Sequence, residues 1–546
     1  MKATKLENDI TDQWAQLFPV AGYTSGWPQN KDIAHLFIPT TDAVHDANDK
    51  IGALRKRLPE ISDADLRTTA DRQLTLLATQ LAWPQPGVAV QDCGDGAFYI
   101  DLLTGKAFGR PDPRKWLPGF LDSAAKKIDF ETERLTKIPL DVTHRRQCLT
   151  AAAYCEATMR ILKKNHSAKI DTVLKKLDHF KQTVDGSIKG LDADDVPTVI
   201  HALREHTGAP TYTEGYPQLL ADLYDFVPSA ADLDTTATTW LEQDLTIVKA
   251  LAAELASLLR LPRGSSVGDV WAEVGRKWPV GAIRVKDAAK ICANFADAYL
   301  VEVPAGLKLS PTPHYLEPMI TGGQDIAVDF LTDKPQSCLY YTEDKTSALL
   351  TMLNVVVHEY SHGINFVLSA QRADSPLLNL AGPMQVPLTE GQAFWREWDF
   401  SHAAADIVGH SGLTGRQCDY LNLYGQTTAE QSQAIRAAQF ETYIWRVVRH
   451  LRAMCDVEVN MGWRTFVDFL DQAGEQTGLT EEFLFGECFT FLAQPGYAPA
   501  YAIDGIRYGQ LQQQAVAKAG TVKDFNTKAS AMGFYPWTIC DRKLRA

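Results

Sequence analysis

Residues 348–368 read ALLTMLNVVVHEYSHGINFVL, an apolar run without proline that carries two histidines four residues apart. Such a run predicts a buried helix, and positions four apart lie on one face of a helix. His358 and His362 are therefore expected to lie side by side, with Glu359 next to them. This H-E-x-x-H pattern is typical of zinc hydrolases, in which the histidines bind the metal and the glutamate is the general base. The alternative is a core helix with two hydrogen-bonded histidines.

The composition is that of a large acidic chain. Its 546 residues carry a net charge of -13, 45% of them are hydrophobic, and the pI is near 5.5. A chain of this size exceeds what one compact core usually holds, so we expect two lobes or one large helical body with a cleft. Nucleic acids and anionic membranes attract basic surfaces. The acidic balance therefore argues against either as the main partner.

Features of exported or membrane-spanning proteins are not recognisable in the sequence. The opening MKATKLEND has no apolar signal segment, and no later stretch offers about eighteen apolar residues free of charge. The nine cysteines are scattered and include no Cys-x-x-Cys pair, which favours free thiols over disulfides or a thiolate metal site. We therefore expect a soluble cytoplasmic protein.

The chain is expected to divide into three regions that together form one continuous unit. Residues 1–119 are interpreted as a helical accessory region, in which 88–90 and 98–100 flank a Cys-Gly-Asp-Gly sequence and predict a short β-hairpin. Residues 120–300 show helical periodicity and are interpreted as a helical lobe. Residues 301–546 contain the histidine motif and are expected to be the catalytic region.

Three short strand candidates precede the histidine helix, at 301–303, 326–330 and 338–341. They predict a small sheet beside the metal. The edge of such a sheet is able to hold an extended peptide by strand pairing. A sheet that touches no substrate is an equal alternative.

Zinc in a hydrolytic site takes three protein ligands and keeps one position open, so a third ligand must come from outside the histidine helix. Glu390 lies in PLTEGQAFWREW (387–398), which reads as the first turn of a second helix. Gly391 beside it would allow a close approach of that helix to the metal. Glu397, two turns along the same face, is the alternative ligand, although we prefer it as an acceptor that orients a ligand histidine. Solvent-exposed helix glutamates remain the simpler interpretation of both.

Several segments resemble one known family. TEGQAFWRE (389–397) resembles the Glu-Gly-Trp-Ala-x-Tyr-x-Glu segment of the domain of unknown function 885 family, itself similar to the carboxypeptidase Taq and neurolysin-type oligopeptidase families. RHLRAMCD (449–456) is similar to that family's Arg-x-x-Arg-x-x-x-Asp helix, and ECFTFLAQPGYAPAY (487–501) to its Glu-rich helix, Pro-Gly turn and tyrosine. The resemblance covers roughly residues 300–540. Asn460 departs from it, because a histidine is usual there.

The resemblance implies a mainly α-helical, two-lobed zinc peptidase of the gluzincin type, with a central cleft and a small sheet next to the zinc helix. It implies one Zn2+ per chain, held by His358, His362 and Glu390. It also implies that Tyr501, which follows the Pro-Gly turn, donates a hydrogen bond to the tetrahedral oxyanion.

Three further residues are candidates for contact with substrate. Tyr497 and Tyr508 flank Tyr501 in sequence, and core or surface aromatics are the alternative for both. Arg507 is able to pair bidentately with a substrate C-terminal carboxylate, which would suit a carboxypeptidase. A solvated helix arginine is the simpler interpretation.

We therefore expect a zinc metallopeptidase of the carboxypeptidase or oligopeptidase type, which hydrolyses short peptides through water activated by Glu359. A zinc amidohydrolase that acts on a non-peptide or modified amide is the first alternative, because the metal chemistry is the same and only the pocket differs. A helical protein that holds a metal without turnover is disfavoured, because Glu359 serves catalysis rather than metal binding.

Overall fold

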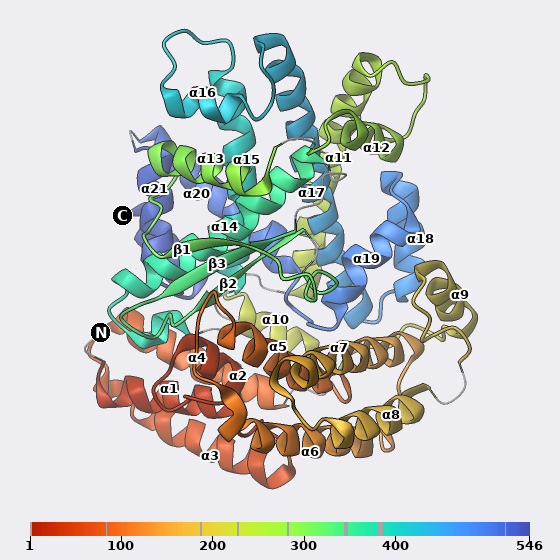
Figure 1. Cartoon of the computed structure of the whole chain (residues 1–546), viewed down its shortest axis with the longest axis vertical. Helices are drawn as coiled ribbons and strands as arrows, with labels where there is room; N and C mark the ends of the chain where they lie inside the picture. Colours follow the sequence, from red (N-terminus) through yellow and green to blue (C-terminus); the bar gives the residue numbers. More distant parts are fainter. Residues whose placement is uncertain are drawn as a thin grey trace.

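Helices build nearly the whole molecule, and one small sheet lies among them (Figure 1). The computed structural model describes residues 3–82, 85–185, 188–226, 229–280, 283–320, 322–342, 348–380, 386–518 and 520–546. The sequence prediction of a mainly α-helical protein with a small sheet next to the histidine helix is confirmed. No helix in these ranges is both long enough and apolar enough to cross a membrane.

The first part of the chain forms a layer of helices at the base of Figure 1. Within this layer α5 packs against α7, and α6 packs against α8. In chain order the elements are α1 (Lys5–Leu17), α2 (Pro19–Ser25), α3 (Thr41–Lys56), η1 (Leu58–Glu60), α4 (Ala64–Ala82), η2 (Val88–Val90), α5 (Gln91–Thr104), η3 (Pro113–Lys115), α6 (Leu117–Leu135), α7 (Val142–His166), α8 (Asp171–Asp185), α9 (Val196–His206) and α10 (Tyr216–Leu223).

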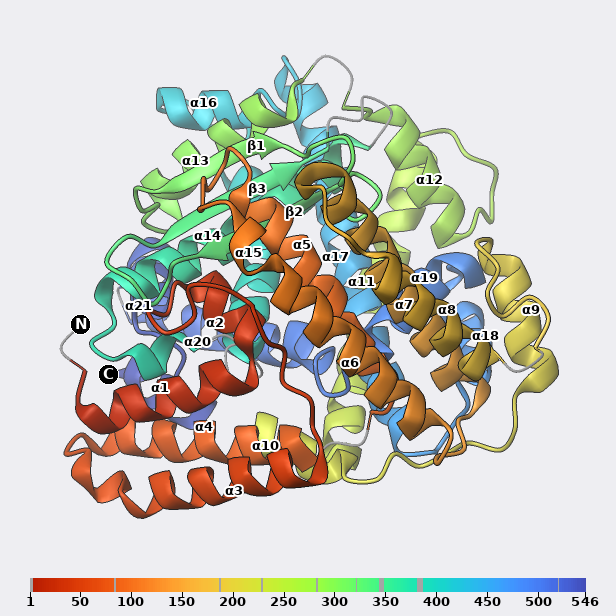
Figure 2. The ribbon, with the colours of Figure 1, turned by 60° about the horizontal axis from the view of Figure 1, so that its bottom comes forward.

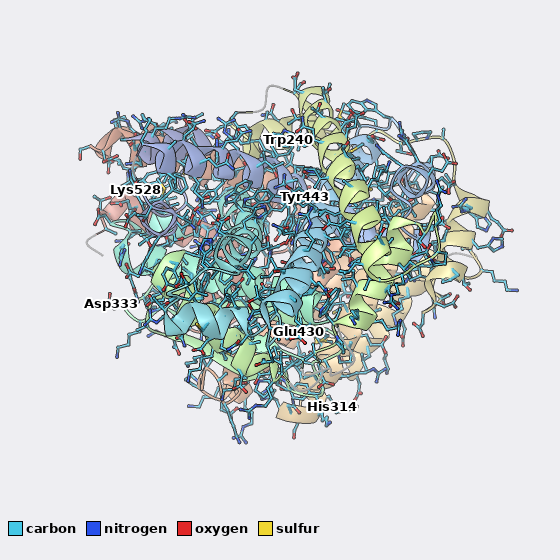
Figure 3. All side chains as sticks on the ribbon, turned by 90° about the horizontal axis from the view of Figure 1, so that it is seen from above. Trp240, His314, Asp333, Glu430, Tyr443 and Lys528 are labelled. Carbon is cyan, nitrogen blue, oxygen red and sulfur yellow. The ribbon has the colours of Figure 1, made fainter. Side chains whose placement is uncertain are left out.

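The second part of the chain carries the sheet and two long helices, α11 and α17, that pack side by side. In Figure 3, Trp240 of α11 and Tyr443 of α17 mark this pair from above. The elements are α11 (Ala230–Leu258), α12 (Val267–Lys277), α13 (Val285–Tyr299), β1 (Leu307–Pro311), β2 (Gly323–Val328), β3 (Gln336–Tyr341), α14 (Leu349–Arg372), η4 (Pro376–Asn379), α15 (Val386–Ile407), α16 (Gly415–Leu421), α17 (Thr428–Asn460), α18 (Phe466–Thr477), α19 (Glu481–Leu492), the π-helix η5 (Ala500–Asp504), α20 (Gly505–Ala517), α21 (Val522–Ala531) and α22 (Trp537–Arg545).

The sheet has the strand order β1-β3-β2, with β1 parallel and β2 antiparallel to β3. Two of the three predicted strands overlap β2 and β3, but the prediction for 301–303 is wrong. There the backbone N–H of Glu302 donates to the Thr527 hydroxyl at 2.8 Å, and that of Val303 donates to the Asp297 carboxylate at 3.2 Å. Side chains thus bond the backbone of this segment where a strand partner would, and the first strand begins only at Leu307.

The predicted β-hairpin around residues 88–100 is also wrong, because η2 and α5 occupy that stretch. Its glycines serve close helix packing instead of a turn. A Cβ added to Gly94 would lie 2.6 Å from the Tyr154 ring of α7, and one added to Gly96 would lie 2.6 Å from the Phe120 ring of α6. Glycine in a helix costs about 1 kcal/mol relative to alanine. Here the absence of a side chain at both positions allows α5 to fit against Tyr154 and Phe120.

The expected region boundary at 119/120 falls inside the first turn of α6, which begins at Leu117. One hydrophobic cluster contains Phe98 of α5, Leu245 of α11 and Leu451 of α17, and so includes residues from all three expected regions. Figure 2 shows the N-terminal helices lying directly over the later part of the chain.

We predict opposite effects of alanine at two helix glycines. Gly94→Ala should lower the free energy of unfolding by about 1–3 kcal/mol, because its methyl group would overlap Tyr154 and approach the Cys155 backbone. Gly52→Ala in α3 is the control: a Cβ there meets nothing within 4 Å, and the substitution should stabilise by about 0.5–1 kcal/mol. Urea denaturation followed by circular dichroism measures both. Equal midpoints for the two variants would contradict the packing role of Gly94.

Candidate metal centre

The helix α14 presents His358 and His362 on one face. Their ring centroids lie 4.8 Å apart at an interplanar angle of 83°. Ligand atoms of the two histidines and of Glu359 all lie within 4.8 Å of one another. The His358 residue is only 7% exposed and the His362 side chain only 13%, so both imidazoles are shielded by the protein. The spacing of four residues therefore places both imidazoles on one face of α14, as the sequence predicts.

Glu390, in the first turns of α15, lies between the two histidines. Its Oε2 atom is 3.2 Å from His358 Nε2 and 3.4 Å from His362 Nε2. Ligands placed tetrahedrally at zinc bond lengths stand about 3.3 to 3.5 Å apart, so both distances from Glu390 Oε2 are close to the spacing of ligands in one zinc coordination sphere. Two imidazoles and a carboxylate are also a donor set that zinc accepts.

Glu397 lies on the other side of His358. Its Oε1 atom is 2.7 Å from His358 Nδ1, and the Arg449 guanidinium donates to both carboxylate oxygens at 3.0 and 2.6 Å. A carboxylate at Nδ1 fixes the imidazole tautomer and leaves the Nε2 lone pair for a metal. Glu390 thus faces the Nε2 atoms of both histidines and Glu397 faces the Nδ1 atom of His358, and their roles as ligand and orienting residue stay predictions.

The electrostatics of this cluster suit a cation. Burial disfavours a charged imidazole, but the hydrogen bonds to Glu390 and Glu397 outweigh it and raise the pKa of His358 to about 9. Burial likewise opposes the charge of Glu390, yet the two histidines hold the pKa of that carboxyl well below its usual range. A divalent cation would compete with protons for these side chains, because metal binding and proton release are coupled.

Two tyrosines complete the surroundings. The Tyr497 hydroxyl donates to Glu390 Oε1, the oxygen that faces away from the histidines. The Tyr501 ring lies 6.0 Å from the His358 ring at an interplanar angle of 23°, carried by the π-helix η5, a geometry that is frequent at functional sites. Burial and the charge of Glu390 raise the pKa of Tyr501. The raised pKa favours the protonated phenol, whose hydroxyl is also hydrogen-bonded to Tyr497.

The backbone of α15 reaches η5 through Gly391. A Cβ at Gly391 would lie 2.9 Å from the carbonyl carbon of Asp504. The sequence analysis expected Gly391 to allow a close approach of its helix to the metal. The close approach that the structure shows is instead between α15 and η5, the helix that carries Tyr501.

Asp325, in β2, is a site residue that the sequence analysis missed. Its backbone N–H donates to Glu359 Oε2 at 2.8 Å, and its carboxylate accepts from the Ser337 hydroxyl. A Cβ on Gly363 would lie 2.9 Å from the Asp325 carboxylate and 2.3 Å from the Ser337 oxygen. The glycine that directly follows His362 was the available signal, since it indicates that something packs closely on that face of α14.

The family-like segments meet in space. Besides the contact of Arg449 with Glu397, Arg452 donates to the backbone carbonyl of Glu487 at 2.9 Å and to its carboxylate. Asp456 accepts from the Gly496 backbone N–H at 2.8 Å. Asn460, which departs from the family pattern, accepts from the Thr213 hydroxyl at 2.9 Å. The helix α17 thus connects α15 with the segment that leads to both tyrosines.

Arg507 and Tyr508 have partners elsewhere. The Arg507 guanidinium lies over the Phe226 ring at 4.1 Å and near the Trp537 ring at 5.5 Å. Tyr508 is fully buried, and its hydroxyl donates to the Asn526 side chain at 2.7 Å. The α20 side chains thus contact Phe226, α21 and α22, and their expected contact with substrate stays a prediction.

A cavity of about 650 Å3 adjoins the centre. Its wall is formed by α1, α3, α4, α5, α6, α10 and the turn at 493–497. Among the described residues, Tyr497 is the candidate site residue that lines it. The hydrogen bond from Tyr497 to Glu390 therefore joins the cavity to the candidate metal ligands.

No family model and no curated protein matches the chain. The fold is similar to two solved structures. One is a "putative lipoprotein" from Colwellia psychrerythraea, 12% identical with a TM-score of 0.58, which covers 99% of this chain and 97% of that chain. The other is a "putative lipoprotein of unknown function" from Shewanella oneidensis, 13% identical with a TM-score of 0.64. The match covers 99% of this chain and 98% of that chain.

At these identities the likeness shows the fold alone, and it extends over almost the full length of all three chains. Because both neighbours are described as lipoproteins, the cytoplasmic location expected from the sequence is overturned and is not retained. The resemblance to the domain of unknown function 885 family stays a prediction.

We predict that the two glutamates of α15 differ in their effect on zinc. Glu390→Ala should abolish stoichiometric zinc binding, whereas Glu397→Gln should keep zinc with an affinity lower by about 10- to 100-fold, as expected of a residue that orients a ligand. The control is Glu242→Ala on the exposed face of α11, which should bind zinc like the wild type. Elemental analysis and competition with a chelator provide the measurements. Reversed results for Glu390 and Glu397 would exchange their roles.

Proposed function

We propose that this chain is a zinc-dependent metallopeptidase with the two-lobed gluzincin architecture, and that it hydrolyses short peptides. The observation that carries the proposal is the convergence of His358 Nε2, His362 Nε2 and Glu390 Oε2 at 3.2 and 3.4 Å. Glu359 lies beside these atoms, as a general base should. Zinc, when bound, acidifies a water molecule and polarises a carbonyl oxygen.

Glu359 would manage the proton in this reaction. Its position on α14 next to His358, with one carboxylate oxygen held by the Asp325 N–H at 2.8 Å, orients the group and leaves its other oxygen available. That oxygen would accept a proton from the attacking water and deliver it to the leaving amine.

Tyr501 and Tyr497 would have different roles in the reaction. Tyr501 is buried, protonated and adjacent to the His358 ring, which suits a donor to the oxyanion that develops on the substrate carbonyl. Tyr497 holds Glu390 by its other oxygen, which suits a residue that orients a ligand.

The sheet and the cavity favour a short peptide as substrate. β2 is an edge strand, and its Asp325 N–H reaches the Glu359 carboxylate, so a chain paired along that edge would pass the general base. The cavity of about 650 Å3 lies within the range of about 300–1,000 Å3 that is usual for small-ligand sites. Folded proteins would not enter such a space.

We predict that Glu359→Gln retains zinc but loses turnover by at least about 100-fold, because the amide preserves the shape and removes the base. The assay is digestion of a mixture of short peptides read by mass spectrometry, with elemental analysis of zinc in the same samples. Glu242→Gln serves as the matched control. Activity of the Glu359 variant within tenfold of the wild type would refute its role as the base. Stoichiometric zinc with no cleaved peptide in the wild type would favour the amidohydrolase alternative.

Phenylalanine at the two tyrosines should give different defects. Tyr501→Phe should lower kcat by about 100- to 1000-fold with KM and zinc content little changed, because an oxyanion donor acts in the transition state. Tyr497→Phe should instead weaken zinc binding, and excess zinc should restore its activity. Steady-state kinetics across a zinc titration separates the two. A higher KM with unchanged kcat in Tyr501→Phe would make it a substrate-binding residue.

A further inference from the structure

The wall of the cavity is mainly apolar but contains a charged end. The apolar part comes from the N-terminal helices and from α10, which lie on the side of the molecule turned forward in Figure 2. Its larger apolar side chains are Leu17, Phe18, Phe37, Leu81, Leu219 and Leu223. The charged end is formed by Asp92 and Asp95 of α5 and by Lys127 and Arg134 of α6.

Both cations of the wall are already compensated. The Lys127 ammonium, on a side chain that is 5% exposed, donates to Asp92 and to the backbone carbonyl of Phe37 at 3.1 Å. Arg134 donates to both oxygens of the buried Glu131 at 3.0 and 3.1 Å. The two cations are thus matched by Asp92 and Glu131. One carboxyl group of the wall, that of Asp95, is left over.

Asp95 has no ion pair with any residue that the structure describes, and its carboxyl group is hydrogen-bonded to Tyr154. Burial and the neighbouring charge of Asp92 raise the pKa of Asp95 to about 7. The residue is nevertheless partly exposed, because it faces the cavity. An ammonium group that entered the cavity would supply the charge that this carboxylate lacks.

The position of Asp95 is rigidly determined. Gly94 and Gly96, on either side of it, are the residues through which α5 approaches α7 and α6. These contacts fix the backbone from which the Asp95 side chain extends. The Cys-Gly-Asp-Gly sequence thus gives this carboxylate the support of a closely packed helix.

The cavity wall also contains a residue that contacts the candidate metal centre. Tyr497 lines the same cavity as Asp95, and its hydroxyl donates to Glu390 Oε1. Asp95 and a neighbour of a candidate metal ligand therefore share one wall.

We infer that this cavity binds the amino-terminal end of a short peptide and that the Asp95 carboxylate receives its ammonium group. The inference rests on the proposed function and narrows it to peptides with a free amine. The apolar wall would receive the first side chains. A lysine side chain presents the same ammonium chemistry, and the experiment distinguishes the two sources. The expected anchor for a C-terminal carboxylate, Arg507, is stacked on Phe226 instead.

The test is calorimetric titration of the zinc-loaded Glu359→Gln protein, which should not turn over the ligand. The titration is done at a pH above the pKa of Asp95, where its carboxyl group is charged. Three peptides are compared: Ala-Leu-Ala, its N-acetylated form, and N-acetyl-Ala-Lys-Ala. Acetylation of Ala-Leu-Ala should weaken binding by about 10- to 100-fold, the usual effect of losing one charged hydrogen bond. Because this comparison needs no change at Asp95, it is independent of how an Asp95 variant folds.

Adding Asp95→Asn should remove the difference between the free and acetylated peptides, while adding Asp122→Asn should preserve it, since Asp122 is exposed on α6 and pairs with Lys126. Asp95-dependent binding of N-acetyl-Ala-Lys-Ala would identify a lysine side chain as an accepted source of the ammonium. Equal binding of free and acetylated Ala-Leu-Ala, with no effect of Asp95→Asn on any peptide, would overturn the inference.

Hydrolysis by the wild-type protein separates this inference from the proposed function. Asp95-dependent binding without any cleavage would leave the inference intact and refute the peptidase proposal. Cleavage of free and acetylated peptides at equal rates, unchanged in Asp95→Asn, would support the peptidase proposal and refute the inference.

Discussion

The buried ion pair between Arg449 and Glu397 is the interaction on which the candidate centre depends. Arg449 donates to both carboxylate oxygens, and Glu397 in turn accepts from His358 Nδ1. Each group is at most 8% exposed, so removal of either would leave an uncompensated charge in the interior, at a cost of about 3–5 kcal/mol. These two contacts therefore link α14, α15 and α17 and determine which nitrogen of His358 faces Glu390.

The helix α17 extends this arrangement along its length. One turn after Arg449, Arg452 pairs with Glu487, and Asp456 accepts hydrogen bonds from Gly496 and from the Tyr216 hydroxyl at 2.8 and 2.7 Å. These bonds position the turn that precedes Tyr497 and Tyr501. Because Tyr216 belongs to α10, they also attach the N-terminal layer to the centre. The long helix thus acts as the common support of the candidate ligands, the tyrosines and the cavity.

The N-terminal helices form part of the cavity beside the candidate centre, whereas the sequence predicted only an accessory layer. They supply most of the cavity wall, including the charged end at α5 and α6. Their packing relies on glycines where two helices come too close for a side chain. The similarity in fold to both solved structures over nearly their whole length indicates that this layer belongs to the common architecture.

The sequence alone determined what depends on local periodicity. The spacing of His358 and His362 requires a shared helical face, and the apolar run around them requires burial, so the shielded histidine pair was predictable. The residues from other elements that surround this pair were only partly predictable. Glu390 and Glu397 lie on one helix and are chemically alike; only the approach of His358 Nε2 to one and of Arg449 to the other assigns their roles. Asp325 lies on a separate strand, and the packing of β2 on α14 alone brings it to Glu359. The glycines around Asp95 were misread because glycine serves turns and close helix contacts equally well, and only the tertiary structure, by placing Tyr154 and Phe120 against them, decides between the two.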